Sequence, residues 1–193
     1  MIRLVPLDQV PSQPWRNGGG STQELLTWPA ADDWLLRISV AQIEQNGPFS
    51  AYPGIDRWFA VVRGIGVALR FAGRTSELTQ GSAPLRFDGA AAPDCNLLNG
   101  STQDLNLMVR DDRGRGVMTR VTVGETWHST VRLRSVFTSE PATLHVDGRH
   151  DVVLPADTLA WSDDAAGQRW RLTSAGAPTR AWWIEVRPRE AVE

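Results

Sequence analysis

Short runs of alternating polar and apolar residues, broken by turn-forming residues about every ten positions, constrain the fold of this chain most strongly. The alternation covers parts of 34–41, 56–69, 104–110, 119–123 and 130–136. Successive side chains of a β-strand point to opposite faces, so this pattern is typical of strands with one buried face. No segment keeps a helical period over three turns with recognisable caps. The sequence therefore predicts an all-β fold.

A short internal repeat suggests how the chain is organised. Two pairs of segments match at an offset of 75 residues: 68–74 with 143–149, and 105–109 with 180–184. The stretch 111–116 between the copies is polar and rich in glycine, as linkers are. We therefore expect two β halves, residues 1–112 and 117–193, packed as one compact unit. The first half carries the informative motifs, and the second is expected to be mainly structural.

The charge and the basic residues exclude several kinds of partner and chemistry. The chain of 193 residues has a net charge of -2, which provides no electrostatic footprint for nucleic acid or an anionic membrane. All 20 basic residues are arginine, so Schiff-base lysine chemistry and a phosphate-loop lysine are excluded. The chain has no apolar stretch long enough for a membrane span, and its start does not resemble a signal peptide. We expect a cytoplasmic protein.

The metal-ligating residues are few and badly placed for a metal site. Cys95 is the single cysteine, so a thiolate cluster and an intrachain disulfide are excluded. The three histidines, His128, His145 and His150, all follow residue 127, outside the half that carries the informative motifs. We therefore predict that the protein binds no metal and needs no cofactor.

Two tracts in the first half place glycine and proline beside arginine and aromatic residues. These are 14–22, which reads PWRNGGGST, and 47–58, which reads GPFSAYPGIDRW. Consecutive glycines let main-chain N–H groups converge on an anion, and a nearby arginine can hold a carboxylate with two hydrogen bonds. The tracts form either a binding pocket or two irregular turns.

Arg57 is the sharpest single candidate. It shares a strand face with Phe59 and Val61, so its side chain should point inward, and a buried arginine needs an anionic partner. Asp56, Glu24 or Asp104 could supply that partner internally, and a ligand carboxylate is the functional alternative.

Two further predicted strands carry polar residues two positions apart, so that these residues share a face. Asp104 and Asn106 share a face with Met108, and Arg37 shares one with Ser39. Such residues are exposed in most strands, and they line a pocket if they lie beside Arg57.

Four blocks taken together resemble the signature of the HutD/Ves family. They read PWRNGGG at 14–20, GPFS at 47–50, PGIDR at 53–57 and DLNLM at 104–108, and they follow the family's order. The resemblance implies a bicupin, in which two cupin-like β-sandwich or barrel halves pack together without the usual cupin metal ligands. It also implies an association with histidine utilisation, in which members are thought to sense a metabolite such as urocanate or formylglutamate.

The resemblance and the residues together define a candidate ligand site. Arg57 is expected to anchor a carboxylate, with Trp15, Asn17, Asp104 and Asn106 as walls. The predicted site is completed by Arg37, Phe49, Gly18 and Gly19.

Three functions are compatible with these features. The first is a metal-free regulatory protein that binds a small carboxylate, with no nucleic-acid or membrane partner; the sequence is compatible with a homodimer. The second is a metal-free cupin isomerase or hydrolase with Asp104 or Glu24 as general base, ranked lower because such isomerases generally use a histidine. The third is a structural protein in which Asp56 alone compensates Arg57.

Overall fold

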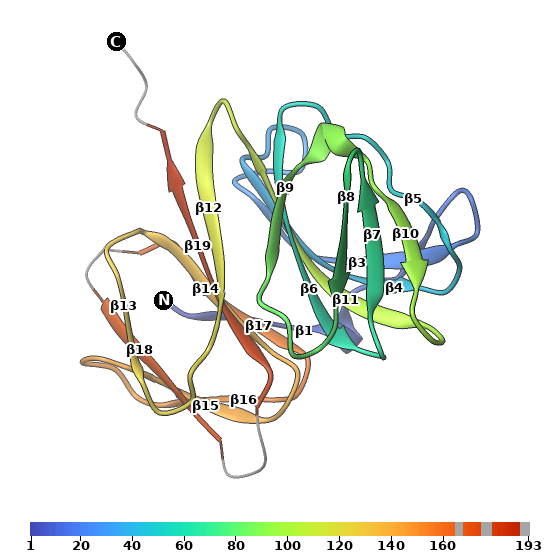
Figure 1. Ribbon diagram of the computed structural model, residues 1–193. Coiled ribbons are helices and arrows are strands. Elements are labelled where there is room, and N and C mark those ends of the chain that lie inside the picture. Colours follow the sequence, from blue (N-terminus) through green and yellow to red (C-terminus); the bar gives the residue numbers. More distant parts are fainter. Residues whose placement is uncertain (165–167, 175–178, 190–193) are drawn as a thin grey trace. The chain divides into compact units, whose positions relative to one another are not determined.

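The computed structural model describes residues 1–164, 168–174 and 179–189, and Figure 1 shows its ribbon. Antiparallel strands dominate, which confirms the all-β prediction. The helical segments within these ranges are two 3-10 turns, η1 (Leu7–Gln9) and η2 (Gly89–Ala91). No helix of the described chain is long and apolar enough to span a bilayer.

The chain divides into two units, which differ from the predicted halves at both ends of the chain. The N-terminal unit contains Pro11–Arg115 with Pro188–Glu193, and the C-terminal unit contains Met1–Val10 with Gly116–Arg187. The first ten residues belong to the C-terminal unit because β1 (Arg3–Pro6) pairs antiparallel with β17 (Thr158–Ser162). A pairing over this sequence distance leaves no local signal in the chain.

The N-terminal unit contains two antiparallel sheets. The six-stranded sheet has the order β2 (Gln13–Pro14), β3 (Gly20–Trp28), β4 (Leu36–Ile43), β11 (Thr102–Arg110), β6 (Ile55–Arg63) and β9 (Leu85–Asp88). The four-stranded sheet has the order β5 (Gly47–Pro48), β10 (Asp94–Leu97), β7 (Val67–Phe71) and β8 (Arg74–Leu78). Buried residues of both sheets form one core cluster, to which β6 contributes Phe59 and Val61.

The C-terminal unit also contains two antiparallel sheets. One has the order β1, β17, β14 (Leu133–Thr138), β19 (Ala181–Pro188) and β12 (Gly114–Arg120). The other has the order β13 (Thr126–Ser129), β18 (Gln168–Thr173), β15 (Ala142–Val146) and β16 (Val152–Leu154). Tryptophans dominate their shared core: the Trp127 and Trp183 rings stack with centroids 4.8 Å apart, and Trp170 meets both edge-on.

The internal repeat corresponds to similar hairpins in the two units. Segment 68–74 forms the β7–β8 hairpin, and segment 143–149 lies in the β15–β16 hairpin. Their turn glycines, Gly73 and Gly148, have φ angles of 81° and 70°. The matched residues are therefore explained by the same turn chemistry, since glycine adopts positive φ without strain.

Two predicted strands have different bounds in the structure. The run 56–69 is divided into β6 and β7 by a tight turn, because Gly64 has a φ of 89° and a Cβ there would lie 2.5 Å from the Ser101 carbonyl oxygen. The run 119–123 overlaps only the end of a strand, because β12 begins at Gly114 and ends at Arg120.

Candidate functional site

A cavity of about 610 Å³ opens within the N-terminal unit. This volume lies in the range of small-molecule sites. Its walls come from β2, β3, β4, β6 and β11, from the loop after β2 and from the segment around β5. The lining residues are Gln13, Pro14, Trp15, Arg16, Asn17, Thr22, Glu24, Arg37, Ser39, Ala41, Pro48, Phe49, Ser50, Tyr52, Arg57, Asp104, Asn106 and Met108. The structure thus brings seven of the nine predicted site residues to one cavity.

Arg57 is a buried residue of the cavity lining, and its side chain is incompletely paired. Only 7% of the residue is exposed, in accord with its position on the inner face of β6. Its Nη2 donates a hydrogen bond of 3.0 Å to Asn106 Oδ1. Its buried Nε has no acceptor among the described residues. An unpaired buried donor is costly, so this nitrogen favours an acceptor that enters from outside.

Aromatic rings surround the Arg57 guanidinium. Its Cζ lies 5.2 Å from the ring centroids of Phe49 and Phe87 and 5.6 Å from that of Tyr52. Such contacts stabilise the cation without neutralising its charge. Desolvation lowers the pKa of Arg57, although the charges of Asp104 and Tyr52 act to raise it.

Asp104 and Asn106 lie beside Arg57 on the inner face of β11. Asp104 is 1% exposed, and its Oδ2 accepts a hydrogen bond from Asn106 Nδ2. Arg57, Asn106 and Asp104 thus form a relay in which the amide separates the cation from the acid. Burial raises the pKa of Asp104 to about 8, although the charge of Arg57 and the bond from Asn106 act to lower it.

Asp56 does not compensate Arg57. Consecutive residues of a strand face opposite sides, and the Asp56 carboxylate accepts bonds of 2.8 and 3.0 Å from Arg86 Nε on β9. Among the residues that the structure describes, no carboxylate lies within ion-pair distance of Arg57. The interpretation of Arg57 as the structural partner of Asp56 is therefore wrong.

Arg37 and Glu24 form an ion pair in the cavity wall. Arg37 donates to Glu24 Oε2 from Nε at 2.8 Å and lies 2.5 Å from it through Nη2. The second oxygen, Oε1, accepts a bond of 2.5 Å from the Thr27 hydroxyl. Arg37 therefore lines the cavity as one half of an internal pair, and Glu24 is occupied as an acceptor.

The glycine tract does not form the expected anion-binding main chain. Gly18 N donates to the Trp15 carbonyl at 3.0 Å, and Gly19 N donates to Asn17 Oδ1 at 3.0 Å. Gly18 and Gly19 are also absent from the cavity lining. The expectation that their N–H groups hold a ligand is therefore wrong. The tract instead lets the chain approach closely, since a Cβ on Gly20 would lie 2.1 Å from the Gln42 carbonyl oxygen.

The loop still positions two predicted wall residues. The Trp15 indole donates a bond of 2.8 Å to Thr22 Oγ1, which fixes the ring at the cavity. Asn17 Oδ1 is engaged by Gly19, so its Nδ2 is the group that can face a ligand. Tyr52 and Thr22 were not predicted for the site. Tyr52 lies in the aromatic-rich tract, and this composition was the signal that could have identified it.

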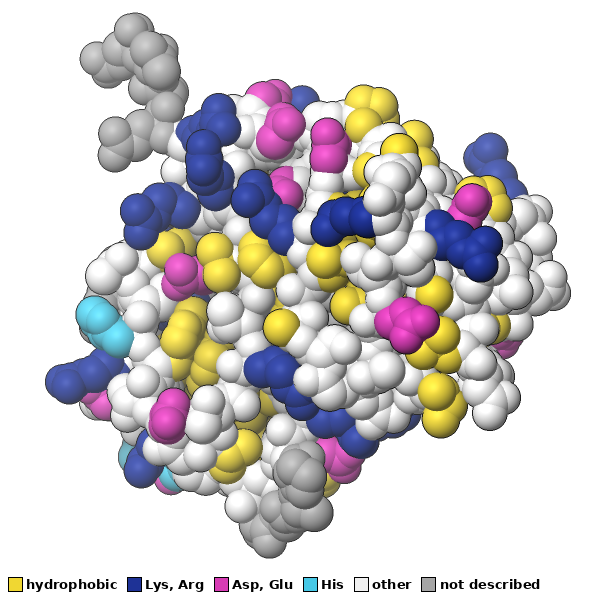
Figure 2. Space-filling model, viewed as in Figure 1, with side chains coloured by type: hydrophobic (Ala, Val, Ile, Leu, Met, Phe, Trp, Pro, Cys, Tyr) yellow, Lys and Arg dark blue, Asp and Glu magenta, His cyan; other side chains and the backbone are white. Residues whose placement is uncertain are grey.

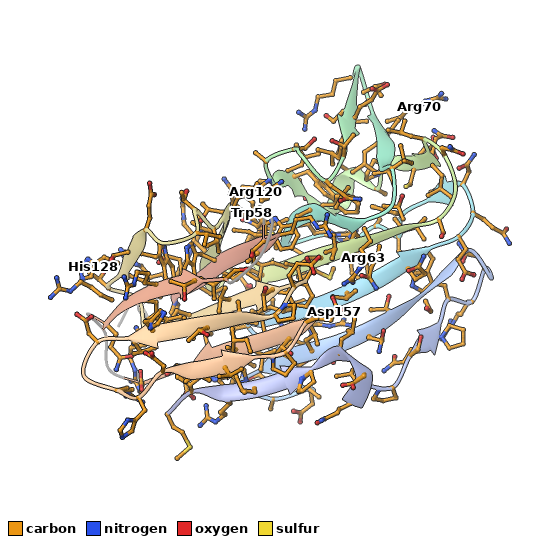
Figure 3. The ribbon with its side chains drawn as sticks, turned by 90° about the horizontal axis from the view of Figure 1, so that it is seen from below. Trp58, Arg63, Arg70, Arg120, His128 and Asp157 are labelled. Carbon is orange, nitrogen blue, oxygen red and sulfur yellow. The ribbon has the colours of Figure 1, made fainter. Side chains whose placement is uncertain are left out.

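The described residues contain no group of three or more metal-ligating side chains. His145 is held by Asp151 and Thr173, each at 2.7 Å, and His128 lies exposed on β13 (Figure 3). Burial raises the pKa of the Cys95 thiol to about 12, assisted by the charge of Asp104. Over the visible face, arginine and acidic side chains are interspersed (Figure 2). The absence of a metal stays a prediction.

Comparison with known proteins identifies the family. The HutD family model matches residues 7–179. The chain belongs to the HutD family. An uncharacterized 21.2 kDa protein in the hutC 3' region of Pseudomonas putida is 33% identical over 116 residues, which are 59% of this chain and 61% of that protein. Protein Ves of Citrobacter koseri is 35% identical over 114 residues, 58% and 60% of the two chains. The match thus spans about three fifths of the length of these relatives.

Solved structures resemble this HutD-family chain over nearly its whole length. HutD from Pseudomonas fluorescens SBW25, solved in a formate condition, has a TM-score of 0.85 at 26% identity and covers 98% of this chain and 100% of its own. A cupin 2 conserved barrel domain protein from Leptotrichia buccalis has a TM-score of 0.56 at 10% identity, over 97% and 96% of the two chains. The second likeness shows a cupin-type fold alone. The two-cupin division stays a prediction.

Proposed function

We propose that this HutD-family protein is a metal-free regulatory protein that binds a small carboxylate metabolite in the cavity of its N-terminal unit. Ligands of the urocanate or formylglutamate type, from histidine degradation, are the expected class. Two comparisons support the association: the relative in the hutC 3' region and the structural neighbour named HutD. The proposed setting is the cytoplasm, where such metabolites arise.

One observation carries the proposal. Arg57 is buried in the wall of a cavity, its Nε has no acceptor among the described residues, and no carboxylate of the described chain pairs with it. A desolvated guanidinium favours a planar anion with two acceptor oxygens, which it can bind through a charge-assisted pair of hydrogen bonds.

The remaining walls suit a small ligand with an apolar middle. Trp15 and Phe49 supply flat apolar surface, and Asn17 Nδ2 supplies a donor away from Arg57. None of these contacts needs a nucleophile or a metal. Binding and sensing are therefore the function that the site supports best.

A second candidate function is a metal-free isomerase or hydrolase. It is favoured by one feature, the raised pKa of Asp104, because a carboxylate that titrates near neutral pH is suited to general acid–base work. Product analysis after incubation with urocanate or N-formylglutamate separates the two functions. Intact ligand after prolonged incubation supports binding alone, and turnover supports the enzyme.

Calorimetric titration with urocanate and N-formylglutamate tests the binding proposal. Arg57→Ala should weaken binding about ten- to a hundredfold, because a charge-assisted hydrogen bond contributes about 1.5–3 kcal/mol net. Arg57→Lys should restore the affinity only in part, since an ammonium cannot reproduce the planar fork.

Arg86→Ala is the matched control, because it removes an arginine from the neighbouring strand, where the side chain pairs with Asp56 outside the cavity lining. It should leave the affinity unchanged. Equal affinity of the folded Arg57→Ala variant and the unaltered protein would contradict the role of Arg57 as anchor.

A further inference from the structure

Asp104 is a buried acid that no cation of the described residues contacts. It is 1% exposed, and the amide of Asn106 is its hydrogen-bond donor. The guanidinium of Arg57 donates to the other end of that amide and not to the acid. The second oxygen, Oδ1, has no hydrogen-bond partner among the described residues. A buried carboxylate commonly needs a cation or several donors, and Asp104 has one neutral donor.

The ionisable groups around Asp104 come from four other strands. Arg57 on β6 and the neutral thiol of Cys95 on β10 interact with it electrostatically. Arg37 on β4 and Glu24 on β3 line the same cavity but neutralise each other as an ion pair. Arg16 and Tyr52 also line the cavity, but both are exposed. Among the described residues, the buried ionisable groups of the lining are therefore the cation of Arg57 and the acid Asp104.

A ligand carboxylate at Arg57 would place a second negative charge near that of Asp104. Two anions would then lie near one desolvated guanidinium, and like charges in a low-dielectric site repel strongly. Protonation of Asp104 removes the repulsion, and the ligand carboxylate is then the anion that the charge of Arg57 stabilises. The free Oδ1 can carry that proton and donate it in a hydrogen bond to the bound anion.

We infer that the cavity binds a carboxylate together with one proton, and that Asp104 carries this proton. The inference rests on the proposed function, because it concerns how the same cavity accommodates its anion. The pKa of Asp104, raised by burial to about 8, supports it, since the acid is already close to neutral before an anion arrives. Anion binding should raise that pKa further and draw a proton from solvent above about pH 8.

The test is calorimetric titration of the intact protein with N-formyl-L-glutamate and, separately, with formate, neither of which titrates between pH 6.5 and 9.5. Measurements in buffers of different ionisation enthalpy give the number of protons taken up. We expect uptake to rise from nearly none at pH 6.5 toward one proton per ligand at pH 9. The dissociation constant should increase about five- to tenfold between pH 7 and pH 9.

Asp104→Asn keeps the size of the side chain and removes the titrating group. It should abolish proton uptake and make the affinity independent of pH over this range. Asp94→Asn, which alters an exposed acid on β10, is the matched control and should keep both effects. If Asp104→Asn does not fold, the proton count of the unaltered protein still decides whether a proton binds together with the carboxylate.

The outcomes separate the inference from the proposed function. Binding without proton exchange, at an affinity that is flat from pH 7 to pH 9, would overturn the inference alone. Proton uptake that persists in Asp104→Asn would overturn the assignment to Asp104. Failure of the unaltered protein to bind either probe at any pH would overturn the proposed function first.

Discussion

Among the described residues, each unit buries one arginine on a strand of its larger sheet, and the two arginines are compensated in different ways. Arg57 on β6 is paired in register with Met108 and Phe87, and Arg134 on β14 with Glu185 and Ser162. Both guanidinium groups lie over aromatic rings of their own unit.

The difference lies in what the chain supplies to each cation. Arg134 is 1% exposed, donates to the Val131 carbonyl at 2.5 Å and reaches Asp164 Oδ1 at 3.0 Å. Arg57 receives an amide oxygen and aromatic rings. The C-terminal unit therefore supplies a carboxylate for its buried arginine, whereas in the N-terminal unit a cavity lies beside Arg57. An internal ion pair stabilises a fold, whereas an incompletely paired arginine is available for recognition.

The two acids of the comparison also titrate differently. Desolvation acts to raise the pKa of Asp164, but hydrogen bonds from the N-terminal ammonium and Ser162 and the charge of Arg149 outweigh it and lower the pKa to about 2. The pKa of Asp104 is raised to about 8. The same residue type is thus a permanent anion in one unit and a titrating group in the other.

The largest expected effect on the free energy of unfolding follows from removing the carboxylate that pairs with Arg134. Asp164→Asn should lower the free energy of unfolding by about 3 kcal/mol, because it leaves the Arg134 charge buried without its carboxylate. Urea denaturation measures the loss. Asp163→Asn is the control: it removes the carboxylate that pairs with exposed Arg3 and should cost about 1 kcal/mol or less. Equal losses in the two variants would contradict the contrast between the units.

A smaller effect on stability is expected for Asp104, the buried acid of the N-terminal unit. Here the negative charge destabilises the fold, whereas at Asp164 it stabilises the fold. The pKa of Asp104 in the folded chain lies above its unfolded value, so the folded state binds the extra proton and stability is lost as pH rises toward 8. Between pH 6 and pH 8 this loss is about 2 kcal/mol, and Asp104→Asn should not show it. Denaturation of both proteins at the two pH values measures the difference. Parallel pH dependence of variant and unaltered protein would refute the raised pKa.

The smallest effect concerns the rings that hold Arg57. Tyr52→Leu should cost about 0.5–1 kcal/mol, because the ring is partly exposed and contributes chiefly a cation–π contact. Tyr52→Phe keeps the ring and should retain most of the stability. Thermal and urea unfolding of the pair provide the measurement. A loss as large as that of Asp164→Asn would mean that the rings compensate Arg57 as fully as a carboxylate would.

Local periodicity predicted the parts of the site that lie on single strands. The alternation of β11 placed Asp104, Asn106 and Met108 on one face, and that of β6 turned Arg57 inward. These residues share the cavity because β6 and β11 are neighbours, with Arg57 opposite Met108 and Phe59 opposite Asn106. The alternation therefore predicts which strand face each residue occupies. The site follows once it is known which strands are neighbours in the sheet.

Features that depend on register or on loop direction could not be predicted. Glu24 meets Arg37 because the register of β3 with β4 places Glu24 opposite Ser39, the same-face neighbour of Arg37. The glycine tract has the composition of an anion-binding loop, but its N–H groups turn toward the chain itself. The first outcome is decided by the register between two strands, and the second by the hydrogen bonds that the loop makes within itself.

The pairing of β1 with β17 has a consequence for the order in which the protein is assembled during synthesis. The strands of the six-stranded sheet all lie between Gln13 and Arg110, so they leave the ribosome as one contiguous stretch. Arg3 leaves before them, yet its partner Trp161 is synthesised far later. β1 therefore has no partner strand when the strands of the six-stranded sheet are already made, because a contact of such high sequence separation forms late.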